Sequence, residues 1–102
     1  NKNVVAFCGI ANPERFFDTL HSEGINILKK YTFSDHHKFT HKEIQAIKKE
    51  SNRLESMVVT TEKDYVRIPK RLRENIKFLS ISIDWNDSKQ LEKLINQIIT
   101  QR

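Results

Sequence analysis

Four short apolar segments alternate with segments of helical periodicity along this chain. The apolar segments lie within residues 4–8, 25–33, 57–59 and 76–83. Strands that alternate with helices form a parallel sheet with right-handed crossovers, because parallel neighbours cannot be joined by a tight turn. We therefore predict a three-layer α/β/α fold with a mostly parallel four-stranded sheet, in the element order βαβαβαβα. The commonest strand order for this pattern is 2-1-3-4.

The first two helical segments carry clear start and stop signals. Asn12 suits an N-cap and Pro13 suits the first helical position, and Gly24 is a suitable stop for that helix. Thr40 and Glu43 have the spacing of a capping box at the start of the second helix. Both connections are therefore predicted to be helical crossovers between parallel strands.

The last part of the chain continues the alternation. Thr61 suits the N-cap of a short helical turn that Pro69 interrupts. The strand predicted over residues 76–83 alternates Ser with Ile near its end, which is typical of a sheet edge. Apolar residues at helical spacing predict a final helix over residues 87–100. They are Leu91, Leu94, Ile95, Ile98 and Ile99.

Size and composition indicate one small domain from a longer protein. The chain has 102 residues, which suits a single domain, and no apolar stretch approaches the roughly 20 residues that span a bilayer. Cys8 is the only cysteine and lies in an apolar run, so we expect a buried structural thiol. The sequence begins at Asn1 without Met and shows no signal peptide, so we expect a piece of something longer.

The net charge of +5 allows two interpretations. A positive balance favours anionic partners such as phosphates, nucleic acid or an acidic membrane surface. The alternative is a solvated, lysine-rich exterior, and the basic residues are indeed spread along the chain without forming a long block.

Polar clusters follow all four apolar segments, at residues 9–15, 35–37, 60–64 and 84–87. The carboxyl ends of parallel strands meet at one edge of the sheet, where open α/β sheets bind ligands. Chain order therefore predicts that these clusters form one site. In the last of them, Trp85 is suited either to stack on a ligand or to pack against the end of the sheet, and we expect packing.

The first two clusters suggest anion binding and proton transfer. Asn12 and Arg15 lie at the start of a helix, where the free backbone N–H groups and the Arg15 guanidinium suit a phosphate. The alternative is an ordinary turn with a solvent-facing Arg15. Asp35, His36 and His37 suit a catalytic or phosphate-contacting imidazole oriented by a carboxylate. Adjacent histidines rarely bind one metal, and no zinc-like spacing is present, so no metal site is predicted. The alternative is a capping Asp35 beside two surface histidines.

The third cluster combines hydroxyl, acidic and basic side chains. Lys63 is suited to neutralise a phosphate, and the hydroxyls of Thr60 and Thr61 are suited to donate to one. The alternative is a capped helix in which the charges of Glu62, Lys63 and Asp64 balance locally.

Several nucleotide-binding and catalytic motifs are absent from the sequence. It contains no G-x-x-x-x-G-K-[ST] phosphate loop, no G-x-G-x-x-G and no nucleophile elbow, and only two glycines. If the chain belongs to an enzyme that acts on nucleotides, another segment must hold most of the phosphates.

Three segments resemble motifs of the tetraacyldisaccharide 4′-kinase family, which phosphorylates a lipid A precursor in Gram-negative bacteria. Residues 7–20 (FCGIANPERFFDTL) resemble "AGIxNPxRFFxxL", residues 33–40 (FSDHHKFT) resemble "FPDHHxYT" and residues 59–66 (VTTEKDYV) resemble "VTTEKDAVK". The motifs occur in the family's order. Ser34 stands where the family usually has Pro, and Cys8 where it usually has Ala.

The resemblance implies a P-loop kinase that moves the γ-phosphate of ATP, with Mg²⁺, to the 4′-hydroxyl of a tetraacyldisaccharide 1-phosphate. It implies two α/β halves, of which this chain is the carboxyl-terminal one. The missing amino-terminal half would carry the phosphate loop, most of the ATP and Mg²⁺ contacts and the membrane anchor. The expected location is the cytoplasmic face of the inner membrane, with no nucleic-acid partner, and the isolated chain is expected to be inactive.

The resemblance also implies roles for the motif residues. A histidine of the Asp-His motif pairs with an acidic residue of the first half to help activate the sugar hydroxyl, and His36 is the natural match. Asp35 and His37 would position it or contact substrate. Asn12, Arg15 and residues 60–64 match motif positions without an individual role.

Two other classes of function remain open from the residues alone. One is a non-catalytic module that binds a phosphosugar, a nucleotide or nucleic acid, although no nucleic-acid motif is present. The other is a response-regulator-like or structural α/β domain, which would need an acidic pocket near the end of the first strand.

Overall fold

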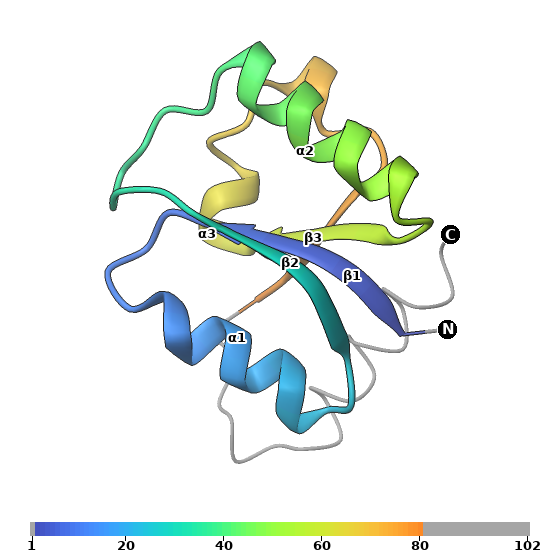
Figure 1. Cartoon of the computed structure of the whole chain (residues 1–102). Coiled ribbons are helices and arrows are strands. Elements are labelled where there is room, and N and C mark those ends of the chain that lie inside the picture. Colours follow the sequence, from blue (N-terminus) through green and yellow to red (C-terminus); the bar gives the residue numbers. More distant parts are fainter. Residues whose placement is uncertain (1, 81–102) are drawn as a thin grey trace.

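A computed structural model describes residues 2–80, which form a parallel sheet between helices (Figure 1). The elements alternate as the sequence predicts. Their bounds are β1 Asn3–Cys8, α1 Pro13–Ser22, β2 Asn26–Thr32, α2 His41–Arg53, β3 Met57–Thr61, α3 Glu62–Tyr65, the 3₁₀ turn η1 Lys70–Leu72 and β4 Ile76–Leu79.

The sheet has four strands in the order β2-β1-β3-β4, and each neighbouring pair is parallel. This confirms the predicted fold class, and the strand order, which the sequence did not determine, is the 2-1-3-4 order commonest for this pattern. β1 lies between β2 and β3, and its residues from Val4 to Cys8 are buried, which explains why its sequence is apolar on both faces. The polar segments that follow β1, β2 and β3 therefore leave the sheet at the same edge.

Side chains of β1 alternate between two apolar layers. Val4, Ala6 and Cys8 join the layer beneath α1, whereas Val5 and Phe7 join the layer beneath α2. Figure 1 shows α1 and α2 on opposite faces of the sheet. The described residues thus form the three predicted layers, with the period-two alternation of a strand deciding which layer each side chain enters.

An aromatic cluster connects the α2 layer to the loop after β2. Phe7 contacts Phe39 edge-on with ring centroids 5.3 Å apart, and Phe33 contacts Phe39 at 5.1 Å. Phe33 and Phe39 lie at the two ends of the segment that joins β2 to α2. Because this segment carries Asp35, His36 and His37, the cluster fixes both ends of the loop that presents them.

β2 is an outer strand of the described sheet and carries Lys29 and Lys30, both exposed. The Nζ atom of Lys29 lies 3.2 Å from a carboxylate oxygen of Glu50 on α2, and that of Lys30 lies 5.1 Å from the ring centre of Phe17 on α1. The two lysines thus lean toward opposite faces of the sheet.

The strand predictions differ from the structure at their ends. β1 begins one residue earlier than predicted, at Asn3, and β3 continues through Thr60 and Thr61, which were predicted to follow it. β2 begins at Asn26 and ends at Thr32, one residue inside the predicted range at each end. β4 ends at Leu79, and Ser80 lies outside it. The rest of the strand predicted to reach Ile83, the cluster at 84–87 with Trp85, and the helix predicted over 87–100 lie outside the described residues. β4 is an outer strand among those described, as predicted.

Cys8 is fully buried, and its burial, with the charge of Asp64, raises the pKa of its thiol to about 12. The thiol therefore stays protonated at neutral pH, which confirms the prediction of a structural cysteine.

No helix within residues 2–80 has the length and apolar character needed to cross a membrane.

Candidate active site

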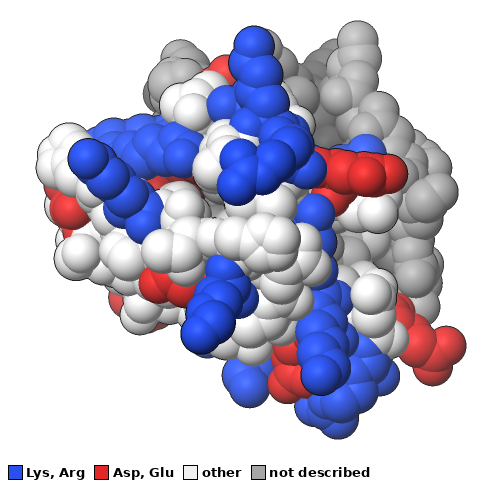
Figure 2. Space-filling view, turned by 90° about the horizontal axis from the view of Figure 1, so that it is seen from above, with Lys and Arg blue, Asp and Glu red and all other residues white. Residues whose placement is uncertain are grey.

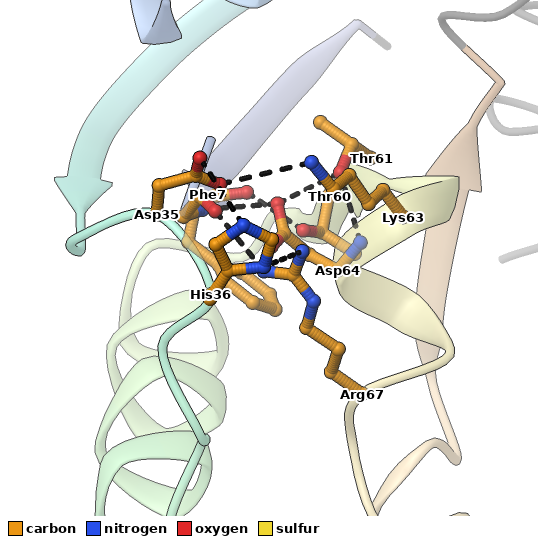
Figure 3. Close-up of polar contacts among 9 residues, drawn as sticks. Phe7, Asp35, His36, Thr60, Thr61, Lys63, Asp64 and Arg67 are labelled. Carbon is orange, nitrogen blue, oxygen red and sulfur yellow. Dashed lines mark hydrogen bonds and ion pairs between the residues drawn. The ribbon is translucent and has the colours of Figure 1, made fainter. Parts of the chain in front are cut away.

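The segments after β1, β2 and β3 meet through direct polar contacts, as Figure 3 shows. Gly9 follows β1, the loop with Asp35 and His36 follows β2, and α3 with Asp64 follows β3. The predicted convergence at one sheet edge is therefore found for these three clusters.

Asp64 is the centre of this arrangement and is fully buried. Its Oδ2 accepts hydrogen bonds from the Gly9 N–H at 2.9 Å and from the Thr61 hydroxyl at 2.7 Å. The Thr61 oxygen in turn accepts from the Asp64 N–H at 3.0 Å and so caps α3. One carboxylate thus joins the end of β1 to the start of α3 by charge-assisted hydrogen bonds.

Arg67 provides the positive charge next to this buried carboxylate. Its Nη1 lies 3.5 Å from Asp64 Oδ1 and donates to the Gly9 carbonyl at 3.2 Å, and its side chain is 19% exposed. Gly9 is therefore bonded at both its N–H and its C=O. Our sequence analysis missed Arg67; the signal available was its position three residues after Asp64, which places the two on one side of a helical turn.

Arg67 also reaches the loop after β2. Its Nη2 lies 3.3 Å from Nδ1 of His36, and Nε2 of His36 lies 3.6 Å from Oδ2 of Asp35. The other Asp35 oxygen lies 3.7 Å from Nζ of Lys63 on α3. A guanidinium only donates, so Nδ1 of His36 is the acceptor, and a neutral ring then carries its proton on Nε2.

A tight turn presents His36 to solvent. The His37 N–H donates to the Ser34 carbonyl at 3.1 Å, and His36, at the third position of that turn, has a φ of +65°. Positive φ is uncommon for a residue other than glycine and is often held in place for function. The His36 side chain is 76% exposed, so its ring is accessible to a ligand.

His37 faces a different set of residues. Its Nε2 lies 2.9 and 3.0 Å from the two carboxylate oxygens of Glu43, and its ring stacks on Phe33 at 4.8 Å. Hydrogen bonds from His37 and from the Thr40 backbone lower the pKa of Glu43 below its ordinary value of 4.5. His37 therefore ties the loop to the capping box of α2, and its contact with a substrate stays a prediction.

The hydroxyls of Thr60 and Thr61 are already engaged within the chain. Thr60 donates to the Phe7 carbonyl at 2.8 Å, and Thr61 donates to Asp64. A hydroxyl has one proton, so neither is available to donate to a phosphate in this arrangement. Glu62 and Lys63 are exposed on α3, and only Lys63 of the two reaches the loop after β2, through Asp35.

Asn12 and Arg15 lie apart from these contacts. Asn12 occupies the N-cap position of α1, but its side chain makes no capping hydrogen bond, contrary to the expectation; Pro13 is the first helical residue as expected. Both residues line a shallow groove along α1 with Glu14, Asp18, Thr19 and Ser22. Within residues 2–80, no hydrogen bond or ion pair joins the Asn12 or Arg15 side chain to the His36 loop.

Magnesium does not fit the described residues as a dedicated site. Residues 2–80 contain no group of three or more His, Cys, Asp or Glu side chains placed to hold a metal ion. The carboxylate of Asp64 is buried and already bonded to Gly9, Thr61 and Arg67, and Mg²⁺ prefers carboxylates that remain open to water and phosphate.

Comparison with known proteins identifies the family. The sequence model of the tetraacyldisaccharide-1-P 4′-kinase family matches residues 1–100. The chain belongs to this family. Its match confirms the resemblance that the three motifs suggested.

Relatives named tetraacyldisaccharide 4′-kinase are similar to nearly the whole chain. The one from Paramagnetospirillum magneticum is 40% identical over 97 residues, which cover 95% of this chain and 30% of the relative. That from Rhodospirillum centenum is 36% identical over 99 residues, covering 97% and 29% respectively. The chain thus spans about 30% of the length of these relatives. No solved structure matches it significantly.

Gly9 generates the first prediction. A Cβ at this position would lie 3.0 Å from the Ser34 carbonyl oxygen, so Gly9→Ala should displace the turn that carries His36. For the kinase activity proposed below, we expect a loss of about tenfold or more in the full-length protein, because misplacement of reacting groups by about 1 Å costs up to 10²-fold.

Gly24→Ala is the matched control for Gly9→Ala. Gly24 has a φ of +79° and lies after α1, so alanine there should lower the free energy of unfolding by about 1 kcal/mol without moving the turn. Equal activity in the two variants at matched folded fraction would contradict the role assigned to Gly9.

The lowered pKa of Glu43 predicts a pH-dependent contribution to stability. A carboxylate with a depressed pKa stabilises the fold above its ordinary value of 4.5 and loses this contribution as pH falls through the folded value. Glu43→Gln should therefore lower the free energy of unfolding by about 0.5–1 kcal/mol at pH 7 and by much less near pH 3.

Urea titrations at several pH values measure this difference. Glu74→Gln, at an exposed turn position, removes a charge elsewhere and should show no such pH-dependent loss. A Glu43→Gln deficit that persists unchanged at pH 3 would show that the carboxylate charge is not the cause.

Proposed function

We propose that the chain is the carboxyl-terminal domain of an ATP-dependent lipid kinase. The intact enzyme would transfer the γ-phosphate of ATP to the 4′-hydroxyl of a tetraacyldisaccharide 1-phosphate in lipid A biosynthesis. The observation that carries this proposal is that the three family-like segments come together at one sheet edge, through Gly9, Asp64, Arg67 and His36. The family match and the names of the relatives support it.

Phosphoryl transfer is achieved mainly by positioning and by stabilising charge, and the candidate site offers both. His36 is exposed at the centre of the edge, where it would deprotonate or orient the acceptor hydroxyl, with Asp35 beside it. Lys63, half-exposed on α3, would stabilise phosphate charge. Arg15 lies on α1, outside this cluster, and would contact substrate only from a different side.

ATP and magnesium would be held mainly by another part of the enzyme. Kinases use ATP, yet these 102 residues contain no phosphate loop, and the described ones offer no metal-binding group. The chain spans about 30% of its relatives' length, which leaves room for a phosphate-binding domain in such proteins. In this proposal, the chain supplies the histidine that acts on the acceptor hydroxyl, and another part of the enzyme binds ATP and Mg²⁺.

The proposed substrate is a lipid, which implies work at a membrane surface, and we propose the cytoplasmic face of the bacterial inner membrane. Lysine and arginine side chains are spread over the face shown in Figure 2. The net charge of +5 favours an anionic surface and an anionic lipid head group.

The role of His36 is tested by its replacement in the full-length enzyme. His36→Ala should lower kcat by about 10²–10⁴-fold, the usual contribution of a group that assists proton transfer. The free energy of unfolding should change little, because the side chain is largely exposed. His41→Ala, at the exposed first residue of α2, is the control and should retain activity. Near-normal turnover of His36→Ala would reject the assignment.

The separation of roles predicts that the 102-residue chain has no kinase activity by itself. Incubation with labelled ATP and the disaccharide acceptor should yield no product, whereas the full-length protein should yield the 4′-phosphate. Phosphorylation by the isolated chain would show that the nucleotide site is not elsewhere. An inactive full-length protein that still binds phosphosugars would favour the alternative of a non-catalytic binding module.

A further inference from the structure

We propose that Arg67 is a positioning residue for His36, holding the imidazole by its Nδ1 so that the Nε2–H faces away from Arg67, on the side of Asp35, and stays available as a donor. The inference rests on the proposed kinase function and assigns a role to the residue directly after segment 59–66, at the position where the motif VTTEKDAVK ends in Lys. Its basis is the set of contacts that Arg67 makes on both sides of the sheet edge.

Arg67 is itself firmly held. Its Nη1 donates to the Gly9 carbonyl at 3.2 Å and lies 3.5 Å from the buried Asp64 carboxylate, and only 19% of its side chain is exposed. Asp64 is fixed by Gly9 and Thr61. The guanidinium therefore has a fixed location before it meets His36, and little additional entropy is lost when the second contact forms.

His36 depends on an external support for the orientation of its ring. The side chain is 76% exposed and stands on a turn residue with positive φ. Among residues 2–80, the side-chain contacts of its ring nitrogens are to Arg67 at 3.3 Å and to Asp35 at 3.6 Å. The Arg67 contact is the shorter one and the only one of the two that is anchored to a buried group.

The contact also selects the tautomer of His36. Because Arg67 has donors and no acceptor, Nδ1 must provide the lone pair, and the proton of the neutral ring resides on Nε2. His36 then serves as a hydrogen-bond donor through Nε2, to a carboxylate or hydroxyl oxygen that faces it. Of the two roles proposed above, this tautomer supports orientation of the acceptor hydroxyl and not its deprotonation by His36. An unsupported ring would exchange between both tautomers and lose part of this orientation, as histidines do when their second-nitrogen partner is removed.

The rigid guanidinium of Arg67 makes two contacts that a lysine, the residue of the family motif at this position, would not make together. Nη1 and Nη2 are fixed in one plane, and here they contact Gly9 and His36 respectively. A single ammonium has no such rigid fork, although it would keep the positive charge beside Asp64. Arg67→Lys is therefore the informative substitution, because it preserves the buried charge pair and removes the contact with His36.

Kinetics of the full-length enzyme provide the first test. Arg67→Lys should lower kcat by about 10–100-fold with an unchanged KM for the lipid acceptor, because Arg67 touches His36 and not the substrate. Arg73→Ala is the matched control: this arginine donates to the backbone carbonyls of Val66 and Ile68, so its loss affects stability and should leave kcat unchanged. A raised KM with normal kcat in Arg67→Lys would instead indicate a direct phosphate contact and overturn the proposal.

A double-mutant cycle shows whether Arg67 acts through His36. In a His36→Ala background, Arg67→Lys should cause no more than a twofold further loss of kcat, since the ring to be positioned is gone. Losses that multiply would mean that the two residues act independently, and the proposal would be wrong.

The ring nitrogens of His36 give a readout that does not depend on catalysis. In the full-length protein with ¹⁵N-labelled histidine, His36 should show a protonated Nε2 and an unprotonated Nδ1, and Arg67→Lys should shift the signals toward a mixture. The His36→Ala variant assigns the signals. A protonated Nδ1 in the unmodified protein would refute the Arg67 contact. The expected tautomer in a protein that lacks kinase activity would instead reject the proposed function and leave the contact intact.

Discussion

The buried carboxylate of Asp64 is the interaction on which the sheet edge depends. An ionised carboxylate inside a protein is costly unless its oxygens are hydrogen-bonded and its charge is paired. Here the Gly9 N–H, the Thr61 hydroxyl and the Arg67 guanidinium meet both requirements. These partners come from the ends of β1 and β3 and from the turn after α3. Satisfying one charge therefore brings together segments separated by more than fifty residues.

Gly9 is required at this position because of the space around it. Its backbone is bonded to Asp64 on one side and Arg67 on the other, and a Cβ would meet the carbonyl of Ser34. The end of β1 therefore approaches the loop after β2 as closely as backbone allows. This close approach fixes the position of the turn that carries His36. The exposed imidazole is therefore held in place by contacts with the buried end of β1.

The fold was predictable from the sequence because it follows from alternation. The apolar run before Gly9, the capping box at Thr40 and the cap at Thr61 are local signals, and parallel pairing then requires the strand ends to share an edge. The same reasoning brought His36 and the Thr61–Asp64 segment together. It did not reveal Arg67, because that contact depends on the turn at His36 and on a long side chain folding back over Gly9. It also grouped Arg15 with the cluster; among the described residues no hydrogen bond or ion pair joins the Arg15 side chain to the His36 loop, and its role stays a prediction.

The two lysines of β2 have a consequence beyond their contacts with Glu50 and Phe17. An outer strand presents unpaired backbone groups, which invite another chain to extend the sheet. Consecutive Lys29 and Lys30 place a charge on each face of that strand, so an incoming strand of this same protein would bring like charges together. This edge of the described sheet is thereby protected against pairing with the same edge of a second copy of the chain.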